Sequence, residues 1–159
     1  MANAYNTNIT TIQCPASGSA GELSFTGDKN GSDNLEQIEA FDGVDDTATA
    51  ANYPAFYFGK NYKDVTGSNV SGTDYESGWY LPSIAELFQI YACRADTING
   101  FDVEAACELC GGDKFGTSYY WSSSQYASDD YFACELDFAD GDRCDKGDHG
   151  RCVCCIRAF

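Results

Sequence analysis

The chain has 159 residues, and its 25 Asp and Glu against 9 Lys and Arg give a formal net charge of -16 at pH 7. This charge argues against a nucleic-acid-binding protein, which neutralises phosphates with Lys and Arg, and against direct contact with an anionic membrane surface. The length fits a single domain over residues 1–159, and no apolar run approaches the roughly 20 residues of a membrane-spanning helix.

The amino-terminal half is rich in Gly, Ser, Thr, Asn and Asp, a composition that favours loops. Loops are expected over residues 17–21, 27–34, 43–47 and 66–76. Before the last of these, the aromatic run Ala-Phe-Tyr-Phe at 55–58 predicts a short β-strand. No signal peptide is expected, because the first residues contain neither a basic region nor an apolar one.

The clearest predicted element is a helix over residues 83–94. Ser83 and Glu86 match the capping-box pattern, in which the serine oxygen accepts a free backbone N–H and the glutamate reaches back to the cap. Apolar residues then recur at helical spacing, which predicts one buried face made of Ile84, Leu87, Phe88 and Tyr91. A second helix is expected over 102–110, with one apolar face made of Val103, Ala106, Cys107 and Cys110.

From Tyr119 onwards the pattern changes to a period of two, which is typical of strands. A strand over 131–138 is expected to turn Phe132, Cys134, Leu136 and Phe138 inward, and Tyr131, Ala133, Glu135 and Asp137 outward. A turn follows at 139–141, and a final strand is expected over 152–159. Helices placed between β-rich stretches indicate an α+β fold.

Four segments in the carboxy-terminal half carry a resemblance to a known family: GWYLPSIAEL (78–87), YYWSSSQY (119–126), LDFADGD (136–142) and VCCIRAF (153–159). They resemble the bacterial C-type-lectin-like domains related to formylglycine-generating enzymes, and the match covers residues 75–159. The resemblance implies a loop-rich α+β domain of the C-type-lectin-like fold, with two helices flanking a small antiparallel sheet. The large apolar residues of these motifs are expected to form the scaffold of the core.

Residues 126–155 differ from this scaffold in the residue types that fill them. They are largely Tyr, Asp, His, Ser, Gly, Cys and Arg, which arise from asparagine codons when adenines are replaced, and Asn is absent after Asn99. In similar domains linked to diversity-generating retroelements, such scrambling produces a hypervariable binding surface. The resemblance therefore implies a non-catalytic ligand-recognition domain with a variable region at 126–155. Scrambling also accounts for the odd number of cysteines, nine.

The outward strand residues and the neighbouring loops are expected to form one contiguous exposed face. Its Tyr and Arg side chains are the expected anchors, and its acidic residues favour a basic partner. The ligand is expected to be a protein or another surface ligand, and the resemblance implies a cell surface or a phage particle as the location. The predicted ligand-binding residues are Tyr126, Asp129, Asp130, Tyr131, Cys134, Glu135, Asp137, Asp140, Asp142, Arg143, Cys144, Asp145, Asp148, His149, Arg151, Cys152 and Cys154.

No cofactor is expected, although two metals can be considered. Zinc ligands are offered by Cys107 and Cys110 together with His149 and the cysteines at 152, 154 and 155, but the first pair is predicted to be buried as small hydrophobes. Calcium stays open, because hard oxygen ligands are offered by Asp137, Asp140, Asp142, Asp145 and Asp148.

The alternative function is a copper-dependent oxidase of the formylglycine-generating type, which holds copper with a pair of cysteines near the carboxy terminus. Cys144 lies eight positions before Cys152, a spacing that departs from the family's pair. A reactive thiolate also needs an electropositive environment, whereas this segment is acidic. His149, the only histidine, lies in a loop, and a Ser-His-Asp triad is not expected.

Overall fold

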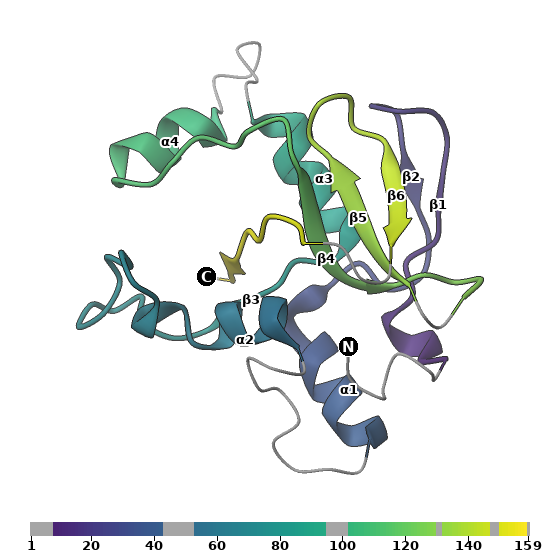
Figure 1. Ribbon diagram of the computed structural model, residues 1–159, viewed down its shortest axis with the longest axis horizontal. Coiled ribbons are helices and arrows are strands. Elements are labelled where there is room, and N and C mark those ends of the chain that lie inside the picture. The colour runs from purple at the N-terminus through teal and green to yellow at the C-terminus, as the bar shows by residue number, and fades with distance from the viewer. Residues whose placement is uncertain (1–7, 43–52, 95–101, 130–131, 147–149, 159) are drawn as a thin grey trace.

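A computed structural model describes residues 8–42, 53–94, 102–129, 132–146 and 150–158, with the backbone alone for 41–42 and 144–146. In these residues the chain forms four α-helices and three small antiparallel sheets (Figure 1). The helices are α1 (Asn34–Asp42), α2 (Pro54–Lys60), α3 (Ile84–Cys93) and α4 (Val103–Leu109). This arrangement is an α+β fold, as the alternation of periods predicts.

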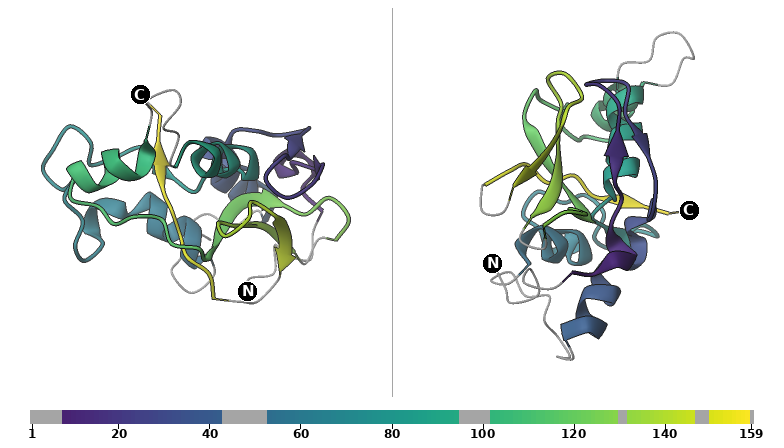
Figure 2. Two further views of the ribbon diagram at one scale, coloured as in Figure 1. Left: turned by 90° about the horizontal axis from the view of Figure 1, so that it is seen from above. Right: turned by 90° about the vertical axis from the view of Figure 1, so that its right-hand side faces the viewer.

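The largest sheet has the order β4-β5-β6, with β4 at Tyr119–Gln125, β5 at Ala133–Asp137 and β6 at Arg143–Lys146. A hairpin of β1 (Ala16–Ser17) and β2 (Ser24–Phe25) forms a second sheet, which runs beside α3 (Figure 2). The third sheet pairs β3 (Trp79–Tyr80) with β7 (Ile156–Arg157) and so ties the carboxy terminus to the segment before α3.

Helix α3 begins as predicted, because Ser83 and Glu86 form a complete capping box. Its buried residues pack on β4 and β5 and make the main core together with Leu136 and Phe138, both fully buried. The Phe138 ring lies 4.4 Å from that of Tyr120 on β4, measured between ring centres. The inward orientation predicted for Leu136 and Phe138 is therefore confirmed.

A second apolar cluster lies around α1 and α2, and it corrects the predicted strand at 55–58. The residues there form helix α2, with Pro54 at its first turn and Phe56 and Gly59 buried at a spacing of three. Proline at the start of a helix supplies a ready-made φ angle and loses no intrahelical hydrogen bond. The cluster consists of Ile9, Ile12, Ile38, Tyr53, Phe56 and Leu81.

The helix predicted at 102–110 is confirmed as α4, capped by Asp102, but its apolar face is not buried. Ala106 and Cys110 are exposed, Cys107 is half-buried, and Leu109 is 89% exposed. Sequence periodicity assumes that another layer covers the apolar face of a helix. Helix α4 instead extends away from the β4–β6 sheet (Figure 1). The predicted final strand is shorter than expected, since within the described residues 152–158 only Ile156–Arg157 and an isolated bridge at Cys152 pair.

The predicted loops have different outcomes. Residues 66–76 form turns and irregular structure, as expected, whereas the stretch at 27–34 contains a 3-10 helix (Gly31–Asp33) that leads into the unpredicted α1. The loop predicted at 43–47 lies outside the described residues. Within the described part, the longest helix has ten residues, and none is long and apolar enough to cross a bilayer.

Candidate functional site

The β4–β6 sheet has two faces, and the register of its strands decides which side chains share each of them. Trp121 pairs with Glu135, and Tyr119 pairs with Asp137, so these four residues lie on the face opposite α3, here called the outer face. Cys134 and Leu136 point the other way, into the core beneath α3. Arg143 on β6 pairs with Leu136 and so shares the inner face at the edge of the sheet.

Glu135 corrects the predicted exposed surface, because its side chain is 0% exposed. The Arg151 guanidinium covers it, with Nε donating to Oε2 at 2.5 Å and Nη2 donating to Oε1 at 3.2 Å. The guanidinium carbon also lies 4.7 Å from the centre of the Tyr119 ring. Strand alternation gave the face of Glu135 correctly but could not reveal that a later segment would cover this face.

That segment adds to the free edge of β4. The Trp121 N–H donates to the Cys152 carbonyl, and the Cys152 N–H donates to the Tyr119 carbonyl, both at 3.0 Å. This short parallel pairing brings Arg151 across the outer face, where its side chain is 20% exposed. Cys152 itself is exposed.

Cys134 is a second correction, because only 1% of the residue is exposed and it belongs to the main core. Its carbonyl accepts a hydrogen bond from the Ser122 hydroxyl at 2.8 Å. A residue in this position cannot touch a ligand at the surface, so it is removed from the predicted site.

The single common face predicted for the site residues does not include Arg143, and the side chains of Tyr131, Asp145 and His149 lie outside the described residues. Arg143 lies on the inner face, with its guanidinium 5.1 Å from the centre of the Tyr126 ring, and Tyr126 packs against the main core. Arg151 lies on the outer face with Glu135. The two predicted arginine anchors therefore belong to opposite sides of one sheet, because neighbouring residues along a strand alternate.

The acidic turn between β5 and β6 is built by its own carboxylates. Asp137 accepts the Ala139 N–H at 2.8 Å, Asp140 accepts the Asp142 N–H at 2.9 Å, and Asp142 accepts the Arg143 N–H at 2.9 Å. Asp140 and Asp142 stay exposed. Each carboxylate thus closes a local turn and keeps a second oxygen for other partners.

The other predicted site residues are less fully described. Asp129 is half-buried, and its carbonyl accepts the Phe132 N–H at 3.3 Å. Cys144 and Asp145 belong to β6, with only their backbone described. The remaining members lie outside the described residues: Asp130, Tyr131, Asp148 and His149.

The carboxy-terminal thiols have an environment that opposes thiolate chemistry. Burial, with a smaller contribution from the nearby Cys107 thiol, raises the pKa of Cys154 to about 12. Burial also raises the pKa of Cys155, with a further contribution from Cys154. A thiol that ligates a metal or attacks a substrate needs the opposite shift.

In the described part of the chain, no three His, Cys, Asp or Glu side chains lie together in a way that could hold a metal ion. Calcium bound through Asp145 or Asp148 involves side chains outside that part, and it stays a prediction.

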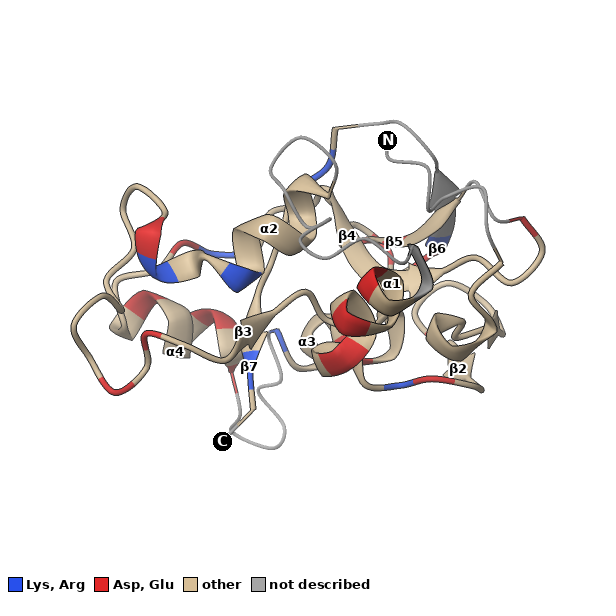
Figure 3. Ribbon diagram, turned by 90° about the horizontal axis from the view of Figure 1, so that it is seen from below, with Lys and Arg blue, Asp and Glu red and all other residues tan. Residues whose placement is uncertain are grey.

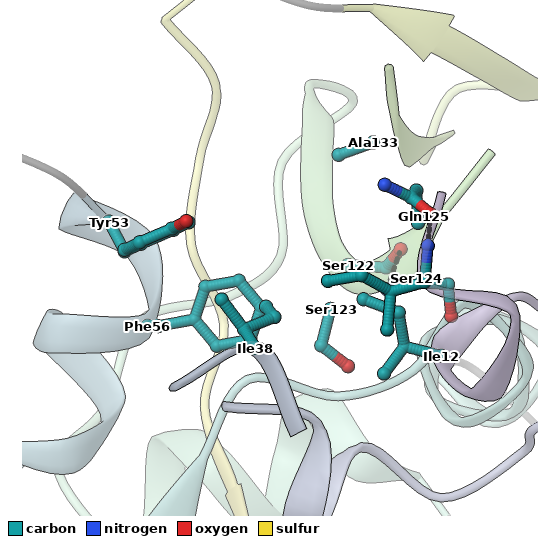
Figure 4. A pocket seen from close by; sticks show the side chains of 10 residues that line it. Ile12, Ile38, Tyr53, Phe56, Ser122, Ser123, Ser124, Gln125 and Ala133 are labelled. Carbon is teal, nitrogen blue, oxygen red and sulfur yellow. Dashed lines mark hydrogen bonds between the residues drawn. The ribbon is translucent and has the colours of Figure 1, made fainter. Parts of the chain in front are cut away.

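A small cavity lies beside the serine triplet of β4 (Figure 4). Its volume of about 20 Å³ suits one or two water molecules. The three hydroxyls already have partners: Ser122 donates to the Cys134 carbonyl, Ser123 accepts from the Asn34 amide, and Ser124 accepts from the Ile84 N–H. The hydroxyls of Ser123 and Ser124 therefore link the sheet to α1 and α3 by hydrogen bonds. The geometry does not support a nucleophilic role for the three serine hydroxyls.

No known protein family, curated protein or solved structure matches this chain. The case for a function therefore rests on the sheet itself and on the residue types of the sequence. Sequence reasoning missed two residues of the outer face, Tyr119 and Trp121, because both lie in a motif whose large residues were expected to form the core. The signal that could have found them is the alternation of β4, which places both on the same side as Glu135.

Proposed function

We propose that the chain is a non-catalytic ligand-recognition domain with a C-type-lectin-like fold. Its recognition surface consists of the outer face and the adjoining turn: Tyr119, Trp121, Asp137, Asp140, Asp142, Arg151 and Cys152. The observation that carries the proposal is Arg151, a half-buried cation fixed by two hydrogen bonds to Glu135 and by the Tyr119 ring. A preorganised arginine beside aromatic rings loses little entropy on binding and is typical of interface hot spots.

The scaffold interpretation is supported by contacts between the segments that carry the family resemblance. The Ser123 N–H donates to the Pro82 carbonyl at 2.7 Å, and the Ile84 N–H donates to the Ser124 hydroxyl at 3.0 Å. Strand β3 of the first segment pairs with β7 of the last. Four motifs that are spread over 82 positions thus meet in one framework, which is what a conserved scaffold requires.

The diversified-surface interpretation is supported by which residue types lie where. Exposed or half-buried positions hold Asp140, Asp142, Arg151 and Cys152, all of which arise from asparagine codons by adenine replacement. The buried Glu135 does not arise in this way, because no asparagine codon becomes a glutamate codon when adenines alone change. At Glu135 burial and codon origin therefore agree, whereas the buried Cys134 is of a type that does arise from an asparagine codon.

The proposed ligand is a basic protein or another basic surface ligand. Asp140 and Asp142 are exposed at the turn, and the chain carries a net charge of -16, so complementary charge would speed the encounter at low salt. A cell surface or a phage particle is the proposed location, and it rests on the family resemblance. The same resemblance supports the proposed role of a retroelement in generating sequence variants.

A pair of displayed libraries tests this function. One library randomises Asp140, Asp142 and Cys152, and the matched control randomises Cys134, Leu136 and Phe138. Both are scored for resistance to protease and then selected on lysozyme, a basic protein. We expect most members of the first library to fold and some to bind, and few members of the control to fold. A surface library that folds but never yields binders, even after repeated selection, would count against a recognition role.

A further inference from the structure

A second cavity lies away from the recognition surface, between α1, α2 and β3, and its volume is about 220 Å³. Its apolar lining comes from all three elements and the residue after β3: Leu35, Phe56, Trp79 and Leu81. Two carboxylates of α1, Glu36 and Glu39, line it as well. Figure 3, seen from below, shows the acidic residues of α1 and the basic end of α2.

The lining is both rigid and negatively charged. The Trp79 indole N–H donates to the Tyr75 carbonyl at 2.6 Å, and its ring lies 4.8 Å from that of Tyr62 between centres. Glu39 accepts from the Lys60 ammonium at 3.5 Å, an ion pair whose lysine side chain is 50% exposed. Glu36 has no ion-pair partner among the described residues. The two glutamates and Lys60 leave one net negative charge at the cavity.

We propose that this cavity binds a primary alkylammonium group, the chemistry of a lysine side chain on a partner protein. The methylene chain would pack on Leu35, and the ammonium would lie between the Trp79 ring and the Glu36 carboxylate. Aromatic faces and carboxylates both attract a cation, while the apolar walls take up its hydrocarbon stem. An anionic group would meet net negative charge, and a neutral polar group would leave the carboxylate without a counter-ion.

The ion pair of Lys60 and Glu39 has a definite place in this proposal. The Lys60 ammonium is an internal competitor, because it already occupies one of the two carboxylates that a ligand would use. Removing it should therefore strengthen binding, whereas removing the charge of Glu36 should weaken it. Nonspecific attraction to an acidic protein would change binding in the same two directions, but it would do so equally for a charge pair away from the cavity, such as Glu108 and Lys114. Glu108→Gln and Lys114→Met are therefore the matched controls, and they should have little effect on binding at the cavity.

The experiment uses Trp79 as the reporter. The chain has two tryptophans, so Trp121→Phe leaves Trp79 as the only one. The protein is titrated with N-acetyl-lysine methylamide, with the norleucine analogue as the neutral control of similar shape. Calorimetry on the unsubstituted chain gives a second readout that does not depend on the Trp121 substitution. Cadaverine, a free diamine, distinguishes a small-molecule source of the ammonium from a peptide source.

We expect the lysine probe to change the Trp79 emission, and the norleucine probe to have no effect. Glu36 and Lys60 are both exposed, so Glu36→Gln should weaken binding only about threefold and Lys60→Met should strengthen it by a similar factor, as for exposed charge pairs. Tighter binding of cadaverine than of the lysine probe would assign the cavity to free amines, and the reverse would assign it to a protein partner. An equal response to the lysine and norleucine probes, or no effect of Glu36→Gln, would overturn the proposal. Either result would leave the proposed function of the recognition surface unaffected.

Discussion

Arg151→Met is the substitution whose effect follows most directly from the structure. It keeps a hydrocarbon stem beside the Tyr119 ring but removes the charge that, among the described residues, neutralises Glu135, whose side chain is 0% exposed. Removing one partner of a buried ion pair destabilises a protein by about 3–5 kcal/mol, because the remaining charge stays buried without compensation.

The free energy needed to protonate the carboxyl group sets an upper limit on this loss, and that limit depends on pH. A carboxyl group with the usual reference pKa of about 4.3 can be neutralised at pH 7 for about 3.7 kcal/mol, and at pH 5 for about 1 kcal/mol. A buried carboxylate that has lost its partner can always take up a proton instead of staying charged. We therefore expect Arg151→Met to lower the free energy of unfolding by at most about 3.7 kcal/mol at pH 7 and by at most about 1 kcal/mol at pH 5.

Urea unfolding at the two pH values, followed by circular dichroism, measures both losses. The double variant Glu135→Gln/Arg151→Met is the control, since it removes the buried charge together with its partner and should recover most of the stability lost at pH 7. A loss below about 1 kcal/mol at pH 7 that does not change with pH would refute the reasoning. It would mean that water reaches Glu135 and that Arg151 is not held as described.

Three further predictions test the fold. Gly31→Ala should destabilise the protein by about 3 kcal/mol in thermal unfolding, because the new Cβ would lie 2.5 Å from two backbone atoms before α3. Gly116→Ala is the control and should have almost no effect, because no atom lies within 4 Å of the new Cβ. With iodoacetamide and mass mapping, exposed Cys152 should react well before fully buried Cys14, and equal rates would contradict the packing. Burial raises the pKa of Cys14 from 9.0 to about 11, so the stability that the neutral thiol contributes should be present below pH 9 and lost as the pH rises to 11. The Cys14→Ala variant should not show this loss, and an alkaline stability profile that is the same in both proteins would contradict the prediction.

The parts of the fold that sequence patterns predict are those that local physics controls. The capping box of Ser83 and Glu86 fixed the start of α3, and strand alternation placed Leu136 in the core, because both depend on residues within one element. The strand predicted at 55–58 was wrong for a related reason. The aromatic composition was given more weight than Pro54, whose position at the first turn was the better local signal.

The candidate site was predicted less well, because its geometry depends on contacts between distant segments. Glu135 is hidden by Arg151, 16 positions later, and nothing in the spacing of the two residues reveals that the chain returns along β4. Arg143 lies on the inner face because β6 pairs it with Leu136, and Arg151 lies on the outer face because it binds Glu135. Both placements depend on contacts between separate segments. Residue types could predict that 126–155 is unusual, but not which of its side chains are exposed.

Sequencing many copies of this gene from one natural population tests the central claim most directly. If a retroelement diversifies a recognition surface, substitutions should concentrate at adenine-derived codons of exposed positions such as Asp140, Asp142 and Cys152. The buried positions Cys134, Leu136 and Phe138 should stay constant, and Arg151 should be kept wherever Glu135 is present. Substitutions spread evenly along the chain, or a segment at 126–155 that never varies, would contradict the account.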